Sequence, residues 1–162
     1  MISAFDAIAD DLAAHGYAIA DQFLSQSEVS SITKLEVFKQ GRQRFKKAGI
    51  GKQQQHQVNE EIRGDYIQWV EKRSPPPELS VYISRVDQLM RYLNRALFLS
   101  LKDAELHMTV YPVGSFYKRH LDQFKKDEHR KLSIICYLNE SWKEEDGGQL
   151  RLYLPDGPKD IL

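Results

Sequence analysis

The sequence predicts an α+β fold in which helices back an antiparallel sheet. Up to about residue 100, apolar side chains recur three and four positions apart, which is the spacing of one helix face. Beyond that point they alternate with polar side chains, which is the spacing of a strand. Helices followed by strands are typical of α+β folds. With 162 residues, the chain fits one domain that is large enough to bury a core.

The composition narrows the possible partners. The 23 basic and 23 acidic residues cancel, so the global charge does not favour nucleic acid or a membrane surface. No apolar run approaches the roughly 18 residues that a membrane span requires. The single cysteine, Cys136, excludes an internal disulfide, and the acidic start of the chain is unlike a signal peptide. We therefore expect a cytoplasmic protein.

The first helix is predicted over residues 3–16. Ser3 and Asp6 approximate a capping box there, and Gly16 suits the C-terminal end of the helix. Residues 17–24, "YAIADQFL", are predicted to form a strand that leads to the second helix.

The second helix is predicted to begin after Ser25, which can form a capping box with Glu28. Its core-facing stripe consists of Val29, Ile32, Leu35 and Phe38. Residues 39–57 follow as a basic, glutamine-rich segment with three glycines, which indicates a mobile surface segment. Two interpretations stay open, a solvated loop or a flap that closes over a substrate.

The remaining elements are one long helix and a series of strands. "SPPPE" at 74–78 breaks the chain before an amphipathic helix over roughly residues 79–98. Strands are predicted from Tyr66 to Val70 and over three alternating segments, "ELHMTVYP", "KLSIICYLN" and "GGQLRLYL". "KDIL", at the end of the chain, can start a further strand.

The stretch "GSFYKRHLDQF" places His120 and Asp122 two residues apart. In an extended chain, residues i and i+2 point to the same face, so an imidazole and a carboxylate would lie side by side. Two readings are open: a surface salt bridge, or two ligands of the His-Asp-His triad that binds non-haem Fe(II).

The neighbouring motifs favour the metal site. "YPVGSFYKRHLD", "YLNESW", "GGQLR" and the upstream "RGDYIQW" occur in one order and spacing over roughly residues 58–162. This combination resembles the 2-oxoglutarate and Fe(II)-dependent prolyl hydroxylases of the oxygen-sensing type and their bacterial relatives. The resemblance implies a double-stranded β-helix, or jelly-roll, core of about eight strands. Residues 1–100 would then be helical support with a mobile loop, and 101–162 the first half of the β-roll.

The resemblance also implies roles for individual residues. His120 and Asp122 match the first two iron ligands, and neither acts as an acid or base. Tyr111 and Tyr137 match tyrosines that line the 2-oxoglutarate pocket, although packing is the commoner role for such tyrosines. The implied cofactors are Fe(II) and the co-substrates 2-oxoglutarate and O₂.

Four residues match the substrate side of that family. Asp65 and Arg130 correspond to an ion pair that ties the "RGD" segment, which begins at Arg63, to the core, and Trp69 corresponds to a tryptophan near the substrate cleft. Tyr117 and Arg119 are weaker matches that suit a scaffold role equally well.

The resemblance requires a second iron-binding histidine and a basic residue for 2-oxoglutarate, both beyond "GGQLRLYLPDG". The chain as given holds neither. We therefore expect a domain truncated before its last strands, and a fragment of a longer protein explains this better than natural truncation or completion by another chain.

The predicted function is hydroxylation of a protein at a prolyl residue, with a translation factor such as elongation factor Tu as a substrate that the bacterial relatives suggest. The main alternative is a truncated, non-catalytic relative that acts as a protein-binding module. An oxygenase acting on a small molecule is a third interpretation, which the long basic loop disfavours.

Overall fold

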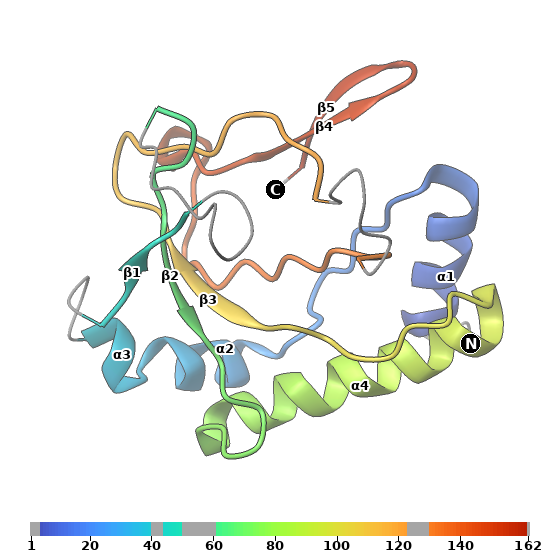
Figure 1. Ribbon diagram of the computed structural model, residues 1–162, viewed down its shortest axis with the longest axis horizontal. Coiled ribbons are helices and arrows are strands. Elements are labelled where there is room, and N and C mark those ends of the chain that lie inside the picture. The colour runs from blue at the N-terminus through green and yellow to red at the C-terminus, as the bar shows by residue number, and fades with distance from the viewer. Residues whose placement is uncertain (1–3, 40–43, 50–60, 123–129, 162) are drawn as a thin grey trace.

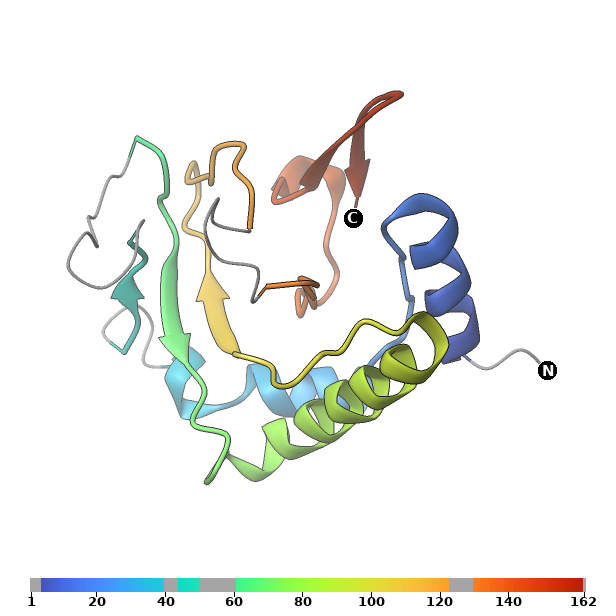
Figure 2. The ribbon, with the colours of Figure 1, turned by 45° about the vertical axis from the view of Figure 1, so that its right-hand side comes forward.

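The computed structural model describes residues 4–39, 44–49, 61–122 and 130–161 (Figure 1). In both views a three-stranded sheet lies on the left, helices run below it to the right, the N-terminal helix stands at the end away from the sheet, and a separate hairpin lies at the top (Figures 1 and 2). The elements are α1 (Ala4–His15), α2 (Gln26–Thr33), α3 (Glu36–Lys39), β1 (Lys46–Lys47), β2 (Tyr66–Trp69), α4 (Pro77–Leu97), β3 (His107–Val110), a short 3₁₀ helix (Glu144–Asp146), β4 (Leu150–Leu154) and β5 (Gly157–Ile161). The predicted α+β class is confirmed.

Helix α1 packs against the C-terminal half of α4. Ile8 and Ala9 of α1 meet Leu89 and Leu93 of α4 in one buried cluster. The helix ends where Gly16 takes a φ of +76°, a left-handed conformation that favours glycine. The predicted first helix is therefore confirmed, while the capping role of Ser3 falls outside the described residues.

The strand predicted over residues 17–24 is wrong. Residues 17–20 are irregular and residues 21–24 form a turn and a bend, in which Gln22 has a φ of +57° that interrupts an extended chain. Phe23 and Leu24 are consecutive, yet both pack into the core. A strand would point them to opposite faces, so burying both requires an irregular backbone.

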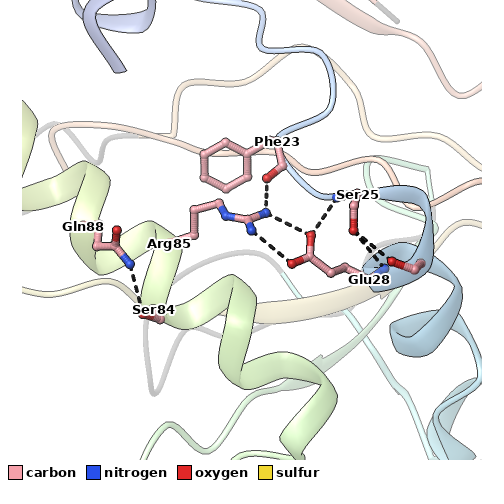
Figure 3. Close-up of polar contacts among 7 residues, drawn as sticks. Phe23, Ser25, Glu28, Ser84, Arg85 and Gln88 are labelled. Carbon is pink, nitrogen blue, oxygen red and sulfur yellow. Dashed lines mark hydrogen bonds and ion pairs between the residues drawn. The ribbon is translucent and has the colours of Figure 1, made fainter. Parts of the chain in front are cut away.

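Helix α2 is fixed to α4 by its capping box (Figure 3). The backbone N–H of Ser25 donates to Glu28 Oε2 at 2.7 Å, and the N–H of Glu28 donates to Ser25 Oγ at 3.3 Å. The Arg85 guanidinium of α4 donates to both carboxylate oxygens of Glu28, at 3.0 and 3.1 Å, and to the carbonyl of Phe23. One carboxylate therefore caps α2 and ties it to α4.

Helix α4 begins at Pro77, two residues earlier than predicted. A proline suits the first helical position because the N–H it lacks would have no intrahelical acceptor there. Its buried face consists of Leu79, Val86, Leu89 and Leu93, which confirms the predicted amphipathic helix. No helix in the described ranges has the length and apolar character to cross a bilayer.

Strands β1, β2 and β3 form an antiparallel sheet in that order. The strands predicted around Tyr66 and His107 are confirmed, and Trp69 pairs with His107 in the register. The described part of the 39–57 segment differs from the predicted solvated loop. Phe45 and Ala48 are only 5% and 1% exposed, and the two lysines between them form β1. Residues 46–47 are thus a short edge strand, with the buried Phe45 and Ala48 on either side, and residues 40–43 and 50–57 of the predicted flap lie outside the described residues.

The C-terminal part contains the β4–β5 hairpin and an unpaired segment. The hairpin confirms the predicted strand at 150–154 and the further strand at "KDIL". Residues 131–139 were predicted as a strand, but no ladder joins them to another described strand. Cys136 and Leu138 still pack against the core, so the alternation reflects burial without pairing. The jelly-roll closure stays a prediction.

Candidate metal and co-substrate site

His120 and Asp122 lie beyond β3, after a turn at residues 112–115 in which Gly114 has a φ of +77°. The two residues are not part of a strand. Their side chains nevertheless meet as expected, with His120 Nε2 3.0 Å from Asp122 Oδ1. Both side chains are partly exposed, so an ion and water can reach them.

The contacts of the His120 ring suit a bound cation. Its Nδ1 lies 2.7 Å from the Lys118 carbonyl oxygen, and its Nε2 faces the Asp122 carboxylate. Both partners are acceptors, whereas a neutral imidazole carries one N–H. If Nδ1–H donates to Lys118, the Nε2 lone pair faces an anionic oxygen, and either a second proton or a metal ion must lie between them. The two residues therefore fit two ligands of one metal ion.

The His120 ring is held by a stack of three planar groups. It lies parallel to the Tyr117 ring, with centroids 3.6 Å apart and planes 15° apart. The Arg63 guanidinium lies over the same tyrosine, 4.5 Å from its ring centre. Tyr117, predicted as scaffold or site, thus connects the "RGD" segment to a candidate ligand.

Backbone pairing brings the "RGD" segment to this position. Arg63 and Tyr117 form an antiparallel bridge, and the N–H of Gly64 donates to the Phe116 carbonyl at 2.9 Å. A Cβ at Gly64 would lie 3.0 Å from the Ser115 Cβ, which is too close without a shift. Glycine at this position therefore allows the two segments to approach each other.

The predicted ion pair between Asp65 and Arg130 is wrong. Asp65 is 1% exposed and accepts two hydrogen bonds from Arg63, at 2.6 and 2.9 Å. Arg130 instead lies 3.7 Å from Glu105. Burial lowers the pKa of Arg63, but its bonds and charge interaction with Asp65 outweigh this and raise the pKa overall. Asp65 still ties the "RGD" segment to the fold, through a partner two residues away.

The second oxygen of Asp122 is held by a residue that the sequence analysis did not single out. Ser133 Oγ donates a hydrogen bond to Asp122 Oδ2. Ser133 lies on the alternating segment at an even spacing from Tyr137, which was the available signal. The backbone carbonyl of Asp122 also accepts a 3.5 Å contact from Arg130.

Tyr111 and Tyr137 border this region. Burial raises the pKa of Tyr111 to about 12, with a contribution from the charge of Asp65, and Tyr137 is close enough to contribute as well. The Tyr137 hydroxyl donates to the Gly148 carbonyl at 3.0 Å, and burial raises the pKa of this phenol. Both phenols are thus protonated donors near neutral pH, which suits a carboxylate ligand, although Tyr137 already uses its proton. Their role with 2-oxoglutarate stays a prediction.

Two further residues considered in the sequence analysis, Trp69 and Arg119, each contact an aromatic ring. Trp69 is 55% exposed and packs edge-on against His107, with ring centroids 5.1 Å apart. Burial and the charge of Arg63 lower the pKa of His107, which favours the neutral ring. The Arg119 guanidinium lies 4.2 Å from the centre of the Tyr153 ring. It therefore connects the segment that carries His120 and Asp122 to β4.

Within the ranges that the structure describes, no third His, Cys, Asp or Glu joins His120 and Asp122 in a metal-binding group. The chain therefore places side by side the two residues that were predicted as ligands. A complete iron site needs the second histidine that the resemblance implies.

Comparison with known proteins shows which family this sequence resembles. Residues 106–161 match the family model described as the 2OG-Fe(II) oxygenase superfamily. Egl nine homolog 1 from Homo sapiens is 30% identical over 155 residues, which cover 88% of this chain and 34% of the human protein. The hypoxia-inducible factor prolyl hydroxylase of Caenorhabditis elegans is 27% identical over 148 residues, or 85% of this chain and 20% of that protein. The chain thus spans about a third or less of these curated relatives.

A solved structure matches nearly the whole chain. The crystal structure of a Pseudomonas putida prolyl-4-hydroxylase superposes with a TM-score of 0.85 and 38% identity, over 98% of this chain and 81% of that one. Oxygenases of the matched superfamily use Fe(II), 2-oxoglutarate and O₂, which confirms the cofactors that the sequence motifs implied. The chain belongs to the 2OG-Fe(II) oxygenase superfamily and is similar to a prolyl-4-hydroxylase within it.

Proposed function

We propose that this chain forms an Fe(II)- and 2-oxoglutarate-dependent dioxygenase domain that hydroxylates a protein at a prolyl residue. One observation carries the proposal: His120 and Asp122 converge at 3.0 Å with both imidazole nitrogens facing oxygen acceptors. In a chain 38% identical to a bacterial prolyl-4-hydroxylase, this geometry suits a metal site better than a surface salt bridge. Residues 1–100 would support it, and 101–162 would belong to a double-stranded β-helix.

In this proposal each residue has a separate task. His120 Nε2 and Asp122 Oδ1 hold the iron, and the Lys118 carbonyl orients the imidazole by accepting its Nδ1–H. When bound, Fe(II) and 2-oxoglutarate supply the O₂ activation needed to hydroxylate a carbon–hydrogen bond. Tyr111 and Tyr137 would donate hydrogen bonds to a carboxylate of 2-oxoglutarate.

The substrate side would lie along the "RGD" segment. Trp69 is well placed for a polypeptide because its indole is exposed at the end of β2. Arg63 and Asp65 bind each other and would shape this surface, with Arg130 beside Glu105 at its border. A protein substrate fits two of the similar proteins, which are named as prolyl hydroxylases, one of them for hypoxia-inducible factor. Elongation factor Tu and a cytoplasmic location stay predictions from the sequence.

The test measures iron binding and prolyl hydroxylation together. Fe(II) is titrated anaerobically into a protein that contains this domain together with the expected second histidine, as the wild type and as the Asp122→Ala and His120→Ala variants. With 2-oxoglutarate and air, oxygen incorporation into proline of purified elongation factor Tu is then followed by mass spectrometry. We expect both variants to lose tight iron binding and all turnover while their melting temperatures stay close to that of the wild type, because both side chains are partly exposed.

Asp156→Ala and His15→Ala are the matched controls, since these residues lie in the exposed hairpin turn and at the end of α1. Both controls should bind iron normally. Unchanged iron affinity in Asp122→Ala would show that the metal assignment is wrong. Feeble iron binding by the wild type, without any 2-oxoglutarate turnover, would favour the binding-module alternative.

A further inference from the structure

We infer that Ser133 is a positioning residue for Asp122: its hydroxyl holds one carboxylate oxygen, so that only the other faces His120 and the metal ion. The inference rests on the proposed function, because it assigns a task to a residue that supports the metal site.

The contacts of the Asp122 carboxylate divide between its two oxygens. Oδ1 lies 3.0 Å from His120 Nε2, on the side where the ion would bind. Oδ2 accepts a hydrogen bond from Ser133 Oγ. A carboxylate with one oxygen engaged in this way presents a single oxygen to a metal and cannot easily rotate to present both. The arrangement therefore favours a one-oxygen ligand and leaves coordination positions for a co-substrate.

The hydroxyl also joins two parts of the chain that lie eleven residues apart in the sequence. Ser133 belongs to residues 131–139, which form no ladder with another described strand. This segment is anchored by neighbouring side chains, since Leu132 packs on the α1–α4 cluster and Cys136 on the α2–α4 cluster. The backbone on either side of Ser133 is therefore anchored by buried neighbours. The segment that carries His120 and Asp122 is more exposed.

A purely structural role for the hydroxyl is disfavoured by its exposure. Ser133 is exposed, and its side-chain oxygen contacts the Asp122 carboxylate. Removing the oxygen therefore leaves no cavity in the core and no buried group without a partner. The second contact to Asp122 comes from Arg130 and reaches its backbone carbonyl, so it cannot orient the carboxylate in the same way.

The experiment compares Ser133→Ala with Ser133→Thr, which keeps a hydroxyl at the same position, and includes Asp122→Ala as a reference. Co(II) is titrated into the full chain, and both its affinity and its visible absorption spectrum are recorded, because the spectrum reports the ligand geometry. We expect Ser133→Ala to bind Co(II) about 10- to 100-fold more weakly, with an altered spectrum, as is typical for loss of a group that orients a metal ligand. Ser133→Thr should restore both the affinity and the spectrum, and all three melting temperatures should agree.

The outcomes separate the inference from the proposed function. If Asp122→Ala loses Co(II) while Ser133→Ala binds it as the wild type does, the metal site stands and the inference is wrong. Equal losses in Ser133→Ala and Ser133→Thr, or a loss that follows a fall in melting temperature, would also overturn it. If Asp122→Ala binds Co(II) normally, the proposed metal site itself fails.

Discussion

The helical half and the site-bearing half of this molecule are stabilised in different ways. Every fully buried apolar residue of the described chain lies between Ile8 and Leu93. Beyond Leu93, large apolar side chains such as Val113, Leu121 and Ile135 are exposed. The site residues are held instead by hydrogen bonds, a guanidinium–aromatic stack and one buried ion pair. Hydrophobic burial thus stabilises the fold, and polar contacts arrange the groups proposed to bind the metal.

Asp65 connects the two halves. It is the only charged residue in the described chain that is fully buried, and its backbone carbonyl accepts from the N–H of Ala48 at 3.0 Å. Its side chain holds Arg63, which lies over Tyr117 next to the candidate iron ligand. Asp65 is therefore one of the residues through which the site depends on the helical half.

The largest difference between the two halves should appear when one leucine in each half is replaced by alanine. Leu93→Ala should lower the free energy of unfolding by about 4 kcal/mol, because Leu93 is 0% exposed in the α1–α4 cluster and its loss leaves a cavity. Leu121→Ala, at 82% exposure, should change it by less than about 0.5 kcal/mol. Urea unfolding followed by circular dichroism measures both, and equal losses would show that the two halves share one core.

A charge substitution in each half compares the contribution of a buried ion pair to the free energy of unfolding with that of an exposed one. Asp65→Asn should cost about 3 kcal/mol, because it leaves the Arg63 guanidinium, with its side chain only 15% exposed, without its anionic partner. Asp160→Asn removes the partner of Arg151 from an exposed pair in the hairpin and should leave the free energy of unfolding almost unchanged. The same urea titrations compare them. A cost for Asp65→Asn as small as that for Asp160→Asn would mean that solvent reaches Arg63.

The helices were largely predictable because their signals are local, although the stripe expected on one second helix is divided, since α2 ends at Thr33 and Phe38 belongs to α3. The capping residues Ser25 and Glu28 and the apolar period of α4 depend only on neighbours in the sequence. The errors arose where the decisive contact is distant. Residues 17–24 bend so that Phe23 and Leu24 can both pack inward. The two-residue strand β1 is too short to show any period.

The same distinction holds within the site. The meeting of His120 and Asp122 followed from their spacing, since two residues apart they need little help to converge. The partner of Asp65 could not be predicted in this way. The sequence contains many arginines, and it does not show which of them folding brings within 3 Å of one carboxylate. The alternating pattern placed Ser133 on the same strand face as Tyr137, but its contact with Asp122, eleven residues away, could not be predicted from local spacing.

The last and smallest effect tests the polar contacts of the helical half by pH. The Arg85 guanidinium and the Ser25 backbone N–H lower the pKa of Glu28 from its ordinary value of 4.5 to about 2. Because this pKa is lower in the folded state than in the unfolded state, the stabilisation is complete above about pH 5 and is lost as the pH falls toward 2. Glu28→Gln keeps the shape of the cap and removes the charge, so its melting temperature should lie below that of the wild type at neutral pH and approach it in acid.

Glu36→Gln is the control, since the pKa of Glu36 is lowered by Lys39 within the same short helix and no other element is tied by that pair. If the difference between Glu28→Gln and the wild type stayed constant from pH 6 to pH 2, the charge of Glu28 would not be what holds α2 to α4, and packing would account for the helical half alone.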